Sequence, residues 1–134
     1  PEVREAMTGR IPETDVFISL GLAWFARTEE AMRPALKVFH SYSRPERQQW
    51  IAFSILQQGG EPALRVVLED VRHRAFQDTE WQERILDANP VADRWRVYRE
   101  HAGDRDPAMA AFAQRKLSAL RAEDRWGVFC LEGD

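Results

Sequence analysis

Apolar residues recur along this chain with the spacing of α-helices, whereas no segment alternates apolar and polar residues for long enough to predict a β-strand. The clearest helix opens at Pro62 and places four large apolar side chains on one face: Leu64, Val67, Leu68 and Val71. Short connections between the predicted helices favour antiparallel neighbours. The pattern therefore predicts an all-α fold of about six to seven antiparallel helices, arranged as a short helical repeat (an α-α superhelix) or as an irregular helical bundle.

Residues at the helix boundaries predict where two of these helices begin. Thr28 is placed to cap the second predicted helix, and Asp106-Pro107 is a strong start signal for the last one. Pro34 lies inside the second helix, where proline removes a hydrogen bond and clashes with the preceding turn. We expect either that this helix begins near Arg33 or that it is kinked.

The helix predicted over residues 13–27 is apolar on nearly every side. A helix of this kind is normally buried, so we expect it to lie at the centre of the fold. The chain has five tryptophans, and we expect the four that fall on predicted inward faces to lie in the core: Trp24, Trp50, Trp81 and Trp95.

Two helical units, residues 15–39 and 49–71, look alike. The first contains Leu20-Gly21 followed by Thr28-Glu29-Glu30-Ala31-Met32-Arg33-Pro34-Ala35-Leu36, and the second contains Gly60-Glu61-Pro62-Ala63-Leu64. Residues 15–71 therefore resemble a HEAT-type repeat, in which two antiparallel helices pair and the second commonly opens around a proline. The resemblance implies a scaffold and transfers no functional residue. A tetratricopeptide repeat and a plain, non-repeating bundle are the alternatives.

Composition limits the classes of function. The length of 134 residues fits one all-α domain, residues 1–134. A net charge of -3 argues against non-specific binding to phosphate backbones as the main role. The longest apolar stretch, residues 16–26, is too short to span a membrane, so no membrane partner is expected. The single cysteine, Cys130, excludes an intramolecular disulfide and favours a reducing, cytoplasmic location.

Groups that could carry catalysis or bind a metal are sparse. Asp70 stands three residues before His73, which could place both on one helix face. A di-iron bundle needs such a pair on each of two helices plus further carboxylates, and the chain offers a single pair. No nucleophile-elbow or phosphate-loop context is present. We therefore predict no catalytic residue, no cofactor and no metal.

An apolar tail at residues 124–134 contains Trp126 and Phe129 and must be covered by something. The tail folds back over the last helices, or it docks into another chain, a second copy of this chain included. Arginines cluster on two helices and interleave with acids, which usually means a salt-bridged, solvated face. Arginine together with an exposed tryptophan is also typical of protein interface hot spots.

We predict a non-catalytic protein–protein interaction module that acts as an adaptor, regulator or inhibitor. The predicted binding residues are Arg65, Arg72, Arg96, Arg99, Trp126 and Phe129. One alternative is a nucleic-acid-binding module that uses an arginine-lined helical face, whose affinity would fall steeply with salt. The other, less favoured, is a small-ligand- or metal-binding helical bundle, indicated only by the Asp70/His73 pair.

Overall fold

The computed structural model describes residues 13–41, 47–77 and 79–131, which fold into seven α-helices with no strand among them. The helices are α2 (Glu13–Ala26), α3 (Glu29–His40), α4 (Arg47–Gln57), α5 (Gly60–His73), α6 (Thr79–Ala88), α7 (Val91–His101) and α8 (Pro107–Glu123). The prediction of an all-α fold with six to seven helices is confirmed for the described part of the chain.

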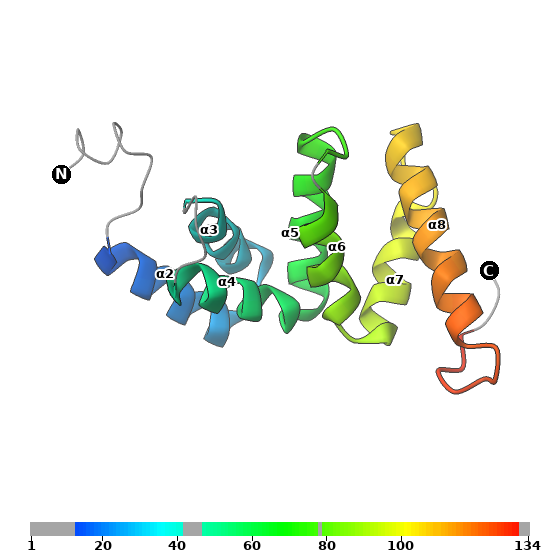
Figure 1. Ribbon diagram of the computed structural model, residues 1–134, viewed down its shortest axis with the longest axis horizontal. Helices are drawn as coiled ribbons and strands as arrows, with labels where there is room; N and C mark the ends of the chain where they lie inside the picture. The colour runs from blue at the N-terminus through cyan, green and yellow to red at the C-terminus, as the bar shows by residue number, and fades with distance from the viewer. Residues whose placement is uncertain (1–12, 42–46, 78, 132–134) are drawn as a thin grey trace.

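The helices pack in two rows. Along one row α3 contacts α5 and α5 contacts α7, and along the other α2 contacts α4 and α4 contacts α6. Contacts between sequential helices, such as α2 with α3 and α7 with α8, join the rows. Figure 1 shows the resulting elongated bundle, with α2, α3 and α4 at one end, α5 and α6 in the middle, and α7 and α8 at the other end.

The predicted caps of two helices are present. Thr28 accepts a hydrogen bond from the backbone N–H of Ala31 at 3.2 Å, so α3 begins directly after it at Glu29. The expectation that this helix begins near Arg33 is wrong, because α3 continues through Pro34. At the other cap, Asp106 accepts from the N–H of Ala108 at 3.0 Å and Pro107 takes the first helical position.

A buried asparagine fastens three helices together. Asn89, at the end of α6, donates from its amide nitrogen to the carbonyl of Leu56 at 3.1 Å and to that of Ile85 at 2.9 Å. Its amide oxygen accepts from the N–H of Gly60, the first residue of α5, at 2.8 Å. Both polar ends of the side chain are thus satisfied in the interior, as burial requires. The α4–α5 turn is held against the end of α6.

The centre of the core belongs to α5, which contacts α3, α4, α6 and α7. Six of its side chains are buried: Ala63, Leu64, Val66, Val67, Leu68 and Val71. Trp95 of α7 is buried as expected, and Trp81 of α6 is partly buried, with its ring 4.6 Å from that of Phe39.

The prediction that the helix over residues 13–27 is central is wrong. It forms α2, which lies at one end of the bundle and packs against α3 and α4 through Val16, Leu20 and Ala23. Trp24 and Trp50, both expected in the core, are 44% and 56% exposed. The apolar pattern shows how many sides of a helix carry apolar residues. It does not show how many other helices of the chain pack against those sides.

Candidate protein-interaction surfaces

Three of the four predicted arginines form ion pairs between α5 and α7. Arg65 reaches Glu61 at 3.2 Å and Glu100 at 2.8 Å, and Arg72 pairs with Asp104 just beyond α7. Arg96 pairs with Glu61, and its other nitrogen lies 2.6 Å from Asp93. The side chains of Arg65 and Arg72 are only 28% and 33% exposed. The arginines here therefore form a salt-bridged surface, as the interleaved acids indicate, and not an open basic stripe.

These pairs change the protonation of their members. The hydrogen bond from Arg96 is the main reason that the pKa of Glu61 lies below its ordinary value, and Arg65 lowers it further. The pKa of Asp104 is lowered first by the backbone N–H of Asp106, 2.9 Å away, and then by the Arg72 guanidinium. The lowered pKa values of Glu61 and Asp104 favour the charged forms of these two carboxylates in the folded protein.

The fourth predicted arginine, Arg99, lies apart from this network, at the α7–α8 end. Its guanidinium lies 6.0 Å from the centroid of the buried Trp95 ring, and that of Arg121 lies 5.3 Å from it. The two arginines border a surface depression of about 480 Å³ between α7 and α8. Cations held over an aromatic ring are ordered by it, and they present charge at a defined place.

The C-terminal tail folds back in part and stays exposed in part. The buried carboxylate of Asp124 accepts N–H groups from Phe129 at 2.5 Å and from Leu131 at 2.8 Å, and Leu131 packs against the core. This turn presents the Trp126 side chain 79% exposed and that of Phe129 43% exposed. The fold-back interpretation holds for the backbone of the tail up to Leu131, whereas the two aromatic rings remain in solvent.

An exposed apolar surface on the outer side of α2 was not predicted. Trp50 and Ile51 of the neighbouring helix α4 are also exposed, and Trp50 lines the groove beside α6. The members of the α2 surface are Phe17, Ile18, Leu22, Trp24 and Phe25. The signal was present in the sequence, since a helix with apolar residues on every side needs neighbours on every side.

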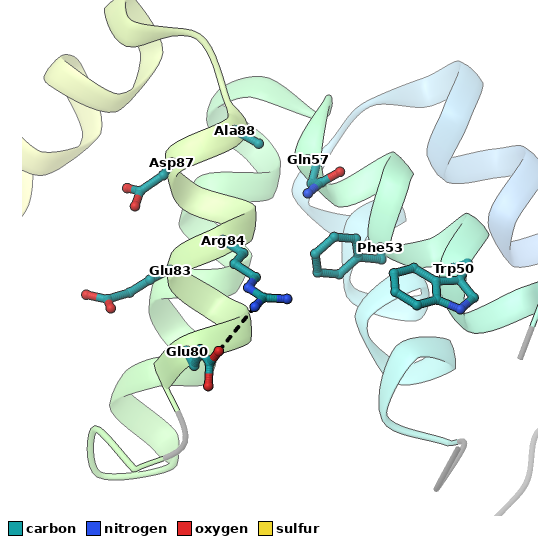
Figure 2. Close-up of a pocket in the computed structure, with 8 residues that line it drawn as sticks. All are labelled: Trp50, Phe53, Gln57, Glu80, Glu83, Arg84, Asp87 and Ala88. Atoms are coloured by element: carbon teal, nitrogen blue, oxygen red, sulfur yellow. Dashed lines mark hydrogen bonds and ion pairs between the residues drawn. The ribbon is translucent and has the colours of Figure 1, made fainter. Parts of the chain in front are cut away.

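A groove of about 680 Å³ lies between α4 and α6. Figure 2 shows Trp50 and Phe53 on the α4 side and Arg84 of α6 pointing toward them, with its ion pair to Glu80 at 3.2 Å. Glu83 and Asp87 also border the groove, but they point away from its aromatic side and pair with Arg115 and Lys116 of α8. The groove is therefore an aromatic wall beside one ion pair, without convergent catalytic groups.

The structure does not bring Asp70 and His73 together as a ligand pair. Asp70 instead contacts His40 of α3 at 3.4 Å, Arg74 at 3.3 Å and the amide of Gln82 at 3.3 Å, whereas His73 is exposed. Burial raises the pKa of Asp70, but hydrogen bonding to His40 and the charges of His40 and Arg74 outweigh it, so the net pKa is lowered. Within the described ranges, no three His, Cys, Asp or Glu side chains are placed to hold a metal ion.

Comparisons of the chain with protein-family models, with curated proteins and with solved structures found no match. In the described part of the chain, none of the helices has the length and apolarity needed to cross a membrane.

Proposed function

We propose that this protein is a non-catalytic protein–protein interaction module, an adaptor, regulator or inhibitor. The observation that carries the proposal is the pair of exposed aromatic rings, Trp126 and Phe129, on a turn anchored by the buried Asp124. Because this backbone is already ordered, binding loses less conformational entropy than it would from a disordered tail. A rigid, exposed tryptophan is the residue type most enriched at interface hot spots.

The surroundings of the tail indicate the chemistry of the partner. Arg125 lies 5.5 Å from the Trp126 ring centroid, and Arg99 and Arg121 flank Trp95 on the neighbouring helices. Cationic groups around an aromatic centre complement a partner surface that combines apolar and acidic side chains. Arg65, Arg72 and Arg96 enter the proposal as a separate polar surface, whose ion pairs hold the guanidinium groups in fixed positions.

The scaffold we propose is a short helical repeat of the HEAT-like kind. Its support is the contact pattern, in which helices two positions apart in the chain stack along each of two rows. Arg115 and Lys116 of α8 extend one row through their ion pairs with Glu83 and Asp87 of α6. Stacked rows of this type leave long outer surfaces for partners.

The test is affinity capture from a lysate of the native source with wild-type protein and with a Trp126→Ser, Phe129→Ser double variant. A Glu80→Ser, Arg84→Ser double variant, which removes an exposed ion pair on α6, is the matched control. We expect a stoichiometric protein that survives nuclease, is retained by the control and is lost with the tail variant. Unchanged fold and unchanged partner binding in the tail variant would remove the tail from the proposal. Recovery of nucleic acid, with steep salt dependence, would favour the arginine-face alternative.

A further inference from the structure

The outer side of α2 is a continuous apolar face that the described chain leaves uncovered. Phe17, Ile18, Leu22, Trp24 and Phe25 are 59%, 62%, 54%, 44% and 84% exposed. Ile18, Leu22 and Phe25 adjoin one another, because they stand four and three residues apart on the helix. Phe17 and Trp24 are seven residues apart, about two turns, on the other side of Gly21. Phe25 is the most exposed of them.

The area of this face is somewhat smaller than that of a typical dimer interface. Five large apolar side chains, each about half exposed or more, amount to about 500 Å² of apolar surface. A monomer's largest apolar patch is usually about 300–600 Å², and a specific interface covers about 800 Å² per partner including its polar rim.

Gly21 lies in the middle of this face. It stands four residues from Phe17 and four from Phe25, and a Cβ built on it would have no atom within 4 Å. Packing inside this chain therefore does not require a glycine here. A small residue flanked by large apolar ones lets a second helix approach closely at that point while its own side chains fill the space on either side.

We propose that the occupant of this face is α2 of a second copy of the chain, packed antiparallel with the two-fold axis near Gly21. An isologous contact requires each residue to face one equally far from the axis on the other side. The sequence meets this requirement, because Phe17 and Phe25 are equidistant from Gly21, and so are Ile18 and Trp24. Apolar rings and branches thus face one another on both sides of the axis.

The charges at the two ends of α2 fit the same register. Asp15 and Arg27, the residue just beyond α2, are also equidistant from Gly21, and both are exposed. The Arg27 guanidinium lies 5.1 Å from the ring centroid of Trp24 and donates to the carbonyls of Trp24 and Gln58. An antiparallel pair brings Asp15 of one copy toward Arg27 of the other, and it opposes the two helix dipoles. A parallel pair would place like charges together. This dimer surface lies at the opposite end of the bundle from the tail, so it stands or falls separately from the proposed function.

A disulfide tests the register directly. In a Cys130→Ser background, Gly21→Cys would place two thiols at the axis, where facing Cα atoms of helices about 8–10 Å apart lie within disulfide reach. The matched control is Glu69→Cys in the same background, an exposed site on α5. Under mild oxidation we expect a covalent dimer of the first variant and a monomer of the second. Equal cross-linking of the two variants would overturn the proposed register.

Sedimentation of the full chain at micromolar concentrations tests the dimer itself. We expect wild type to sediment as a dimer, and Phe25→Asp to raise the dissociation constant at least tenfold by burying a charge in the interface. Phe25 is so exposed in one copy that the variant should keep its helical circular dichroism, and Trp126→Ser should leave the dimer intact. Wild type that sediments as a monomer throughout, or a Phe25→Asp variant that dimerises as well as wild type, would overturn the proposal.

Discussion

Two helices of equal length, α2 and α5, show how differently the same number of residues can be used. Each has 14 residues, and α2 contains more large apolar side chains. Yet α5 buries six side chains against four neighbouring helices, whereas α2 packs against α3 and α4 through Val16, Leu20 and Ala23. A helix contributes to stability when other helices cover its apolar side chains. Apolar side chains that no helix covers remain as surface that is available for binding.

Polar contacts also distinguish α5 from α2. On the α3 side α5 is joined through Asp70 and His40, on the α4 and α6 side through Asn89, and on the α7 side through Arg65 and Glu100. We therefore expect substitutions around α5 to change the free energy of unfolding. Substitutions on the outer side of α2 should change association instead.

The largest contrast is expected between two leucines. Leu64 of α5 is fully buried, so Leu64→Ala removes apolar contacts and leaves a cavity, at a cost of about 3–4 kcal/mol in the free energy of unfolding. Leu22 of α2 is 54% exposed, and Leu22→Ala should cost no more than about 0.5 kcal/mol. Urea unfolding at low protein concentration, where the chain is monomeric, measures both. Equal losses for the two variants would break the comparison.

The next effect is expected at Asn89, which joins the start of α5 to α4 and α6. Asn89→Ala would leave the N–H of Gly60 and the carbonyl of Leu56 buried without this partner, so we expect a loss of about 2–3 kcal/mol. Ser54→Ala on the exposed side of α4 is the control and should be close to neutral. Urea denaturation midpoints at unchanged slope give the comparison. A loss no larger than that of the control would mean that water replaces Asn89 without cost.

Much of this fold follows from the sequence, and the reasons are local. The caps at Thr28 and Asp106 and the single apolar stripe of α5 involve residues within a few positions of one another, so short-range rules predict them. Long-range neighbours are not encoded in this way. The contact of Asp70 with His40 instead of His73 joins residues thirty positions apart, and nothing in the local pattern indicates it.

The candidate surfaces show the same difference between features that local sequence predicts and features that depend on long-range packing. Trp126 and Phe129 are predicted to lie in an apolar tail that either the last helices or another chain must cover, and the structure leaves both rings exposed. Arg65 and Arg72 are predicted on a solvated face, but their ion-pair partners on or beyond α7 depend on packing. The α2 face was missed because an all-round apolar helix is usually central, and only the missing neighbour reveals the exposure.

A smaller effect, and one that depends on pH, is expected at the α3–α5 contact. The pKa of Asp70 lies below its ordinary value of 3.8, so the folded state holds this proton less tightly than the unfolded chain. The contribution of Asp70 to stability is complete above that ordinary value and is lost as the pH falls through the lowered folded pKa. Asp70→Asn should reduce stability near neutral pH and flatten its decline in acid. Thermal unfolding from pH 2 to pH 7 measures this, and parallel curves for the two proteins would contradict it.

The smallest effect is expected where α5 meets α7 in solvent. Arg65 and Glu100 form a short ion pair, but the Glu100 side chain is 52% exposed, so water and salt screen the attraction. A double-mutant cycle of Arg65→Ala and Glu100→Ala should give a coupling energy of about 0.5 kcal/mol that shrinks as salt is added. Arg84 and Glu80, an exposed pair within α6, are the control and should couple no more strongly. A coupling energy of about 2 kcal/mol that salt does not weaken would mean that this surface behaves like a buried network. In that case the position of α5 would depend on its charges as much as on its apolar side chains, and the contrast with α2 would no longer be one of apolar neighbours alone.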